Sequence, residues 1–318
     1  MAHWPSISRR QFLGRTLAAG TAGVAVPRLF PDTLAAAPAA WKEGQWQIGC
    51  YTRPWDKFEY RVALDAIAEA GYKHAGLMTT KSDTRLVISV KTTPEEAHAV
   101  GEEVKRRGMQ VPSVYGGGIP IDKSLDAGIE GMKRLIDNCA AAEAASLLMG
   151  GIGNEKLYET YYKAVAETAD YAAEKGIVIT VKPHGGLNAT GPQCRKTIDF
   201  VGKKNFRIWY DPGNIYHYSD GRIGPVDDAA TVDGLVVGMC IKDFAMSKEG
   251  EKLKKDVWIT PGTGMVDFKA VLARLKPGGF TGGPLVVECF ARGDDPDPKA
   301  LVAEAKKARE FVEQLVKG

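Results

Sequence analysis

The sequence "VITVKPHGG", residues Val178 to Gly186, combines a buried β-strand with a polar strand end. Its first four residues are apolar or β-branched, which favours a strand that is covered on both faces. Lys182 and His184 follow at alternate positions. Because side chains alternate between the two faces of an extended chain, both should point to the same side. The stretch therefore predicts a buried strand that delivers an ammonium group and an imidazole to one point.

The alternation of an apolar run with an amphipathic segment recurs along the chain from Trp46 onward. One amphipathic segment carries Thr93, Pro94 and Glu96, which are typical of a capped helix start. Alternating strands and helices over about 270 residues predict an α/β protein with a (β/α)8 TIM barrel, and a doubly wound open sheet is the alternative. The predicted strands are residues 46–51, 73–78, 110–115, 146–149, 177–181, 206–210, 236–241 and 284–288.

The first 39 residues differ in composition from the rest of the chain. Arg9 and Arg10 precede an apolar run rich in glycine and alanine, and residues 35–39 offer small-residue cleavage sites. This stretch resembles a twin-arginine (Tat) export signal, which implies a periplasmic or extracellular mature protein. An uncleaved membrane anchor and a basic nucleic-acid arm are the alternatives. Arg15 interrupts the apolar run, which is shorter than the roughly 20 residues that span a bilayer.

We therefore predict a Tat signal peptide and cleavage region over residues 1–39, and a single TIM-barrel domain over residues 40–318. Removing the first segment takes the formal net charge from +3 to zero, because it holds four arginines and one acidic residue. A neutral domain without a Lys/Arg cluster does not favour nucleic-acid binding. We expect no membrane span after cleavage.

The cysteines are odd in number and form no CxxC pair, so we expect most of them to be core thiols. They are Cys50, Cys139, Cys194, Cys240 and Cys289. The glycine clusters at residues 116–118 and 150–153 lack the GxGxxG and GxxxxGK[ST] forms, and they do not predict a nucleotide site.

Four residues with reactive or charged side chains lie at the ends of four consecutive predicted strands. They are Lys182, Asp211, Cys240 and Glu288. Each alone has an ordinary explanation, such as solvation for a lysine, helix capping for an aspartate or core packing for a cysteine. In a TIM barrel, however, the carboxyl ends of the strands meet at the end where chemistry takes place. The four residues therefore predict one shared site.

Several motifs occur in an order that resembles the sugar isomerase/epimerase superfamily of xylose-isomerase-like TIM barrels. They are "YDPGN" at 210–214, "CIKD" at 240–243, "PGTGMVDF" at 261–268 and "VVECF" at 286–290. The superfamily also includes inosose dehydratases and, more distantly, endonuclease-IV-type enzymes, and the resemblance covers about residues 46–316. It implies that strands five to eight supply Glu, Asp, His and Glu to one divalent cation, and that a histidine two residues after the first Glu touches the sugar.

The sequence departs from this pattern at two positions. Asp211 and Glu288 match the second and fourth ligands, and His184 matches the histidine on the sugar side. Lys182 stands where the first Glu is expected, and Cys240 replaces the ligand histidine.

The lysine at this position argues against a metal. Three carboxylates with a divalent cation sum to −1, and so do protonated Lys182, Asp211 and Glu288 without one. An ammonium about 4 Å from a divalent ion would be repelled by roughly 8 kcal/mol at an effective dielectric constant of 20. We therefore expect no cofactor. The alternative is a divalent metal (Mn, Mg or Zn), and its ligands would be Asp211, Glu288, Cys240 and His184.

The resemblance implies chemistry that starts with proton removal next to a carbonyl. Lys182 would stabilise the enediolate, Glu288 would be the general base, and His184 would polarise the sugar oxygen. Lys182 acting as a base or a Schiff-base nucleophile is the alternative. Candidate substrate-binding residues are Tyr51, Trp55, Asn214, His217 and Lys242. For His217, a surface loop position is an equal alternative.

Taken together, these features predict an exported sugar isomerase or epimerase whose partner is a small-molecule sugar or polyol. A lyase or dehydratase of the same fold is the first alternative, because it shares the proton-removal step. A non-catalytic carbohydrate-binding barrel that has lost its metal site is the second. An endonuclease is disfavoured, since five histidines are few for its ligand set. A homo-oligomer is compatible with the sequence.

Overall fold

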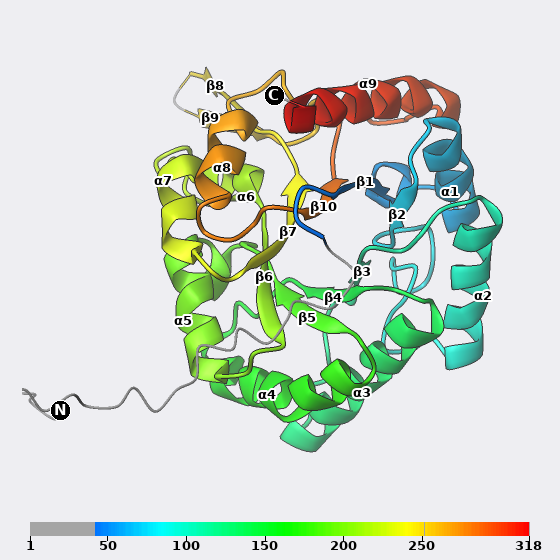
Figure 1. The fold of residues 1–318 in the computed structure, drawn as a ribbon, viewed down its shortest axis with the longest axis vertical. Helices are drawn as coiled ribbons and strands as arrows, with labels where there is room; N and C mark the ends of the chain where they lie inside the picture. Colours follow the sequence, from blue (N-terminus) through cyan, green and yellow to red (C-terminus); the bar gives the residue numbers. More distant parts are fainter. Residues whose placement is uncertain (1–41, 251, 318) are drawn as a thin grey trace, which may run out of the picture. The chain divides into compact units, whose positions relative to one another are not determined.

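The computed structural model describes residues 42–250 and 252–317. The predicted export signal and cleavage region, residues 1–39, lie outside the described residues, and export stays a prediction. Within the described chain, parallel strands lie at the centre and helices surround them (Figure 1). The sheet has eight strands in the order β2-β1-β10-β7-β6-β5-β4-β3. Parallel bridges from His74 to Gln110 and from Leu77 to Val114 join its two edges. The TIM barrel is thereby confirmed over the open sheet.

All eight predicted strands are present, although β2 and β3 are shorter than expected. The barrel strands are β1 (Trp46–Tyr51), β2 (His74–Gly76), β3 (Val114–Tyr115), β4 (Ser146–Met149), β5 (Val178–Val181), β6 (Phe206–Tyr210), β7 (Val236–Ile241) and β10 (Gly283–Val287). Isolated bridges continue the pairing beside the two short strands.

Helices follow the strands and cover the outer face of the barrel (Figure 1). They are α1 (Tyr60–Glu69), α2 (Pro94–Arg106), α3 (Leu125–Ala141), α4 (Tyr158–Glu174), α5 (Gly191–Val201), α6 (Pro212–Tyr218), α7 (Pro225–Ala229), α8 (Phe268–Leu275) and α9 (Pro298–Lys317). The predicted capping box starts α2: the Thr93 hydroxyl accepts from the Glu96 amide at 3.2 Å, and the Glu96 carboxylate accepts from the Thr93 amide at 2.8 Å. None of the helices in the described residues has the length and apolar character needed to cross a bilayer.

An apolar layer fills the barrel interior beneath the carboxyl ends of the strands. It consists of the buried side chains of Tyr51, Met78, Leu148, Trp209, Cys240 and Val286. Because strand side chains alternate with a period of two, the residue two positions later on each strand also faces inward, one level higher. This layer is therefore the floor on which the residues at the strand ends stand.

An antiparallel hairpin that was not predicted follows β7. It is formed by β8 (Ala245–Glu249) and β9 (Lys252–Asp256) and carries mostly exposed, charged side chains. The chain then returns to the barrel through the "PGTGMVDF" segment. The buried Asp243 carboxylate holds this segment by accepting backbone N–H bonds from Gly262, Gly264 and Val266 at 2.8–3.1 Å. One carboxylate thus fixes the loop next to the site.

Candidate active site

Five charged residues stand directly above the apolar layer, at the ends of five strands that are neighbours in the sheet. Each follows an inward-facing residue by two positions, as Asp211 follows Trp209 and Glu288 follows Val286. The five are Arg53 after β1, Glu288 after β10, Lys242 after β7, Asp211 after β6 and Lys182 after β5. The two-residue period of the strands therefore brings five charges together.

The five side chains form one network of ion pairs. The Lys182 ammonium donates to Glu288 Oε2 at 2.5 Å and to Asp211 Oδ2 at 3.2 Å. The Lys242 ammonium lies 2.5 Å from Glu288 Oε1 and donates to Asp211 Oδ2 at 3.2 Å. Arg53 Nη1 also donates to Glu288 Oε1. Two carboxylates are thus shared among three cations.

The network is almost completely shielded from solvent. Asp211 and Glu288 are fully buried, and Lys182 and Lys242 are 1% and 2% exposed. Asn214 positions Lys242, because its Oδ1 accepts from the ammonium at 3.1 Å while its Nδ2 donates to the Pro183 carbonyl at 2.6 Å. The guanidinium-bearing side chain of Arg53 is the accessible member, with 27% of its surface exposed.

The network fixes the charge state of Lys182 and Glu288. Burial alone would lower the pKa of Lys182, but Glu288, Cys240 and Asp211 raise it well above its ordinary value. Burial alone would raise the pKa of Glu288, but Lys182, Lys242 and Arg53 bring it well below its ordinary value. Lys182 is therefore an ammonium at neutral pH, which disfavours its alternative role as a base or Schiff-base nucleophile.

His184 stands beside the network as a neutral imidazole. Burial, followed by the charges of Lys182 and Lys242, lowers the pKa of His184 to about 3. Its ring centroid lies 6.2 Å from that of Tyr115 and 6.0 Å from that of Tyr218. A neutral imidazole has one N–H donor and one acceptor nitrogen, so it can polarise or protonate a substrate oxygen.

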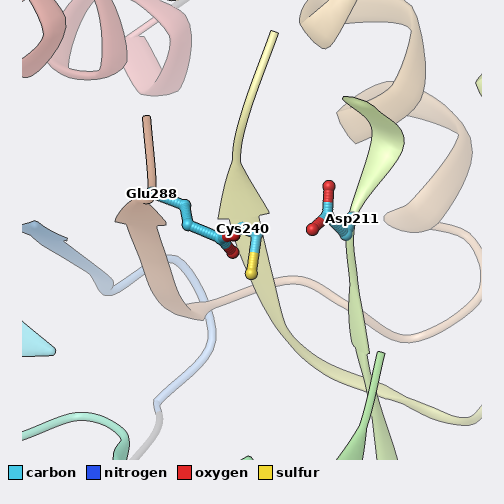
Figure 2. Close-up of side chains that lie close together, drawn as sticks. All are labelled: Asp211, Cys240 and Glu288. Carbon is cyan, nitrogen blue, oxygen red and sulfur yellow. The ribbon is translucent and has the colours of Figure 1, made fainter. Parts of the chain in front are cut away.

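Three side chains also lie close enough together to be tested as ligands of a metal ion. The ligand atoms of Asp211, Cys240 and Glu288 lie within 4.8 Å of one another. These side chains come from the ends of β6, β7 and β10 and converge, as Figure 2 shows. Burial raises the pKa of the Cys240 thiol well above its ordinary value, so this ligand is protonated. His184 is not part of the group among the described residues.

The predicted substrate-binding residues fall in four different places. Lys242 belongs to the charge network, and Asn214 accepts a hydrogen bond from it. Tyr51 lies in the apolar layer below it, with a buried hydroxyl that has no partner among the described residues. Trp55 is fully buried, and its ring packs edge-on against Phe290 at 5.4 Å. It therefore offers no stacking surface to a sugar.

His217 lies on α6 and is half-buried. Its ring packs edge-on against Tyr218 at 5.0 Å and against Phe244 at 6.2 Å. These contacts make it part of the packing at the α6 end of the site, and its Nδ1 is buried without a partner among the described residues.

Arg53 and Trp258 were not predicted as site residues. The Arg53 guanidinium carbon lies 5.1 Å from the centroid of the Trp258 ring, and that of Arg292 lies 3.6 Å from it. Arg53 follows its strand as Lys182 follows β5, so the same strand-end pattern could have identified it. Trp258 comes after the unpredicted hairpin, and no pattern in the sequence indicates its position.

A cavity of about 440 Å³ lies at the opposite end of the barrel from the charge network. Its lining includes Gln47, His74 and Gln110, near the amino ends of the strands, and none of the five charged residues. In TIM barrels this end contributes to stability, and chemistry takes place at the other. The charge network is therefore the candidate active site.

Comparisons with known proteins identify the family to which the fold belongs. Residues 64–314 match the family described as "Xylose isomerase-like TIM barrel". A curated relative, the inosose dehydratase of Glaesserella parasuis serovar 5 (strain SH0165), is 25% identical over 178 residues, which is 52% of this chain. The matched part spans 57% of the length of that relative.

Solved structures are similar in fold at low sequence identity. A xylose isomerase domain protein from Planctomyces limnophilus has a TM-score of 0.64 at 19% identity, over 86% of this chain and 98% of its own. An L-ribulose 3-epimerase has a TM-score of 0.65 at 16% identity, over 86% of this chain and 95% of its own. D-allulose 3-epimerase from Methylomonas sp., solved with D-allulose, has a TM-score of 0.65 at 18% identity, over 86% of this chain and 98% of its own.

Because the network holds more cations than carboxylates, we expect the loss of a carboxylate to destabilise the protein more than the loss of a cation. Glu288→Gln leaves three cations around one carboxylate, so we expect a loss of about 3–5 kcal/mol in the free energy of unfolding. Lys182→Met leaves Lys242 and Arg53 with both carboxylates, so its loss should be smaller. Urea denaturation followed by circular dichroism measures both. A larger loss for Lys182→Met would contradict the arrangement of charges.

The low pKa of His184 predicts a dependence of stability on pH. The unfolded chain takes up a proton at this residue below about pH 6.5, whereas the folded protein does not until about pH 3. The contribution is therefore complete above pH 6.5 and is lost as the pH falls, by about 2 kcal/mol between pH 7.5 and 5.0. His184→Gln should remove this component in urea denaturation at the two pH values. His98→Gln, at an exposed position on α2, is the matched control and should keep the wild-type slope. Equal slopes in all three proteins would refute the assignment.

Proposed function

The chain belongs to the Xylose isomerase-like TIM barrel family, and on that premise we propose that it is an enzyme acting on a sugar or polyol derivative by removing a proton next to a carbonyl. The structural neighbours include sugar 3-epimerases, and the curated relative is an inosose dehydratase. Both kinds of reaction can begin with this step. From the sequence of residues 1–39 we further propose that the enzyme acts after export.

The observation that carries the proposal is the buried network of three cations at the carboxyl ends of the barrel strands. Removing a proton next to a carbonyl leaves negative charge on oxygen. Cations held in fixed positions, in a site of low dielectric constant, stabilise this charge without having to reorganise. Lys182 and Lys242 are fixed by Asp211 and Glu288, so their ammonium groups are preorganised for this role.

Glu288 remains our candidate general base, although its pKa in the free protein makes it a weak one. Its Oε1 accepts from Arg53 and contacts Lys242, and its Oε2 accepts from Lys182. We propose that a substrate oxygen takes over the contact of Arg53, the accessible cation. Glu288 then loses a stabilising charge and becomes more basic. His184, as a neutral imidazole, donates its N–H to the substrate oxygen.

We infer that the site works without a divalent metal, because its residues do not fit one. Asp211 Oδ2 and both oxygens of Glu288 already contact ammonium or guanidinium groups at the positions that ligands would need. The sequence alone suggested a site with a charge of −1. With Lys242 and Arg53 included, the five groups sum to +1, and a divalent ion would be repelled by three neighbouring cations.

Metal analysis tests this inference. We expect less than about 0.1 equivalent of Mn or Zn per chain after expression with added metal and dialysis. The Lys182→Glu, Cys240→His double variant has a site charge of −1 and a new imidazole ligand, so it should gain metal. Cys240→His alone keeps Lys182 and is the matched control that should remain metal-free. One tightly bound metal per wild-type chain would refute the inference.

A second candidate is a non-catalytic barrel that binds a carbohydrate. The observation that favours it is the low basicity of both groups assigned to proton transfer, because Glu288 and His184 have depressed pKa values in the free protein. A site made only for binding has no need of a base.

Solvent exchange separates an enzyme from a binding barrel. We expect the enzyme to exchange the C–H next to the carbonyl of a keto-sugar with deuterium from D₂O, whichever product is finally formed. Proton NMR of D-fructose and of 3-keto-glucose, incubated with the protein, measures this exchange. Lys182→Met should slow it by about 100-fold or more, as expected for the loss of one preorganised charge. Calorimetric binding of these sugars without exchange would favour the binding barrel.

A further inference from the structure

The buried network carries one more positive charge than negative charge. Lys182, Lys242 and Arg53 oppose only Asp211 and Glu288. Within the described residues, Asp211 and Glu288 are the only carboxylates that form ion pairs with these three cations. The excess charge is therefore not compensated by another acidic side chain in this part of the protein.

Arg53 is the cation of the network whose side chain is most exposed to solvent. The two lysines are buried between the carboxylates, whereas 27% of the Arg53 side chain is exposed. Among the described residues, the Arg53 guanidinium makes one hydrogen bond, to Glu288. A guanidinium has five N–H donors, so most of them are free to bind a ligand.

The neighbouring Arg292 does not share this property. Its guanidinium donates to the Asp56 carboxylate at 2.7 and 3.3 Å and to the Pro54 carbonyl at 2.9 Å. Its charge is therefore neutralised by Asp56. The ring of Trp258 lies close to both guanidinium groups and limits where Arg53 can move.

We propose that the ligand of this site is a sugar acid, with a carboxylate that binds Arg53, and that Arg53 determines this specificity. The inference rests on the proposed function and names its substrate class. One carboxylate neutralises the excess charge of one, whereas a phosphate monoester, with a charge near −2, would reverse it. The planar fork of a guanidinium also matches the two oxygens of a carboxylate.

A neutral sugar is the rival ligand. In that case the excess charge serves only the enediolate that forms during the reaction, and the binding of the ground state would not depend on the charge of Arg53. The two ligand classes therefore differ in binding as well as in turnover.

Isothermal titration calorimetry with matched sugars tests the proposal. The pairs are D-glucuronate with D-glucose and D-galacturonate with D-galactose, and glucose 6-phosphate serves as the dianion. We expect at least one uronate to bind at least about tenfold more tightly than its neutral partner and than the phosphate. The affinity for the uronate should decrease when the NaCl concentration is raised from 20 to 300 mM, while the affinity for the neutral sugar should stay the same. The salt dependence needs no variant, so it remains informative if a variant fails to fold.

Three variants assign the effect to Arg53. Arg53→Met should reduce the uronate preference to less than about threefold, and Arg53→Lys should keep part of it because the charge is retained. Lys269→Met removes one positive charge from an exposed position on α8 and is the matched control that should bind as the wild type does. Equal binding of acid and neutral sugar, tighter binding of the phosphate, or an unchanged preference in Arg53→Met would overturn the proposal.

Deuterium exchange on the bound ligand separates this proposal from the proposed function. Selective uronate binding without exchange supports the ligand class and contradicts the enzyme. Exchange on a neutral keto-sugar, without any preference for acids in binding, supports the enzyme and contradicts the ligand class.

Discussion

The placement of the Lys182 ammonium between Asp211 and Glu288 is the constraint on which the rest of the site depends. Two carboxylates converging from neighbouring strands, with no solvent to separate them, would repel each other strongly. An ammonium bonded to both removes that repulsion. It also lowers the pKa of Glu288 and contributes to the low pKa of His184. Lys242 contacts the same two carboxylates and acts in the same direction, so the protonation states of the neighbouring groups follow from the two lysines together with burial.

The barrel makes this arrangement rigid. Inward-facing side chains of the barrel form an apolar layer, and one level higher, side chains at the ends of five neighbouring strands form the charge network. The apolar layer keeps water out from below, and the low dielectric constant that results strengthens every ion pair above it. The same low dielectric constant makes an unbalanced buried charge costly. The excess positive charge of the network therefore favours the binding of an anion.

The fold could be predicted almost completely from the sequence, because eight apolar runs separated by amphipathic segments have few other solutions. The convergence of Lys182, Asp211 and Glu288 also followed, since each ends a strand. The omission of Arg53 from the predicted site, and of Lys242 from the residues predicted to converge with Lys182, had one cause. Arg53 lies two positions after Tyr51 of the apolar layer, and Lys242 lies two positions after Cys240. The two-residue alternation of strand side chains was applied to β5 but not to β1 and β7. Trp55 was misplaced because a short helical turn, Arg53–Trp55, directs its ring toward Phe290 and α9.

The charge of the site, rather than its fold, distinguishes this protein from what its resemblance implied. A change of one ligand position from Glu to Lys alters the local charge by two, and in the metal-free site that we propose, an ammonium of fixed position takes the place of an exchangeable metal ion. A metal can polarise two substrate oxygens by taking both as ligands, whereas an ammonium acts as a point charge with hydrogen bonds. On this proposal, the site holds its substrate less by chelation and more by charge balance. The balance of charges leaves Arg53 as the group that we propose the substrate binds, so in this proposal the selection of the substrate and the stabilisation of the reaction depend on the same three cations.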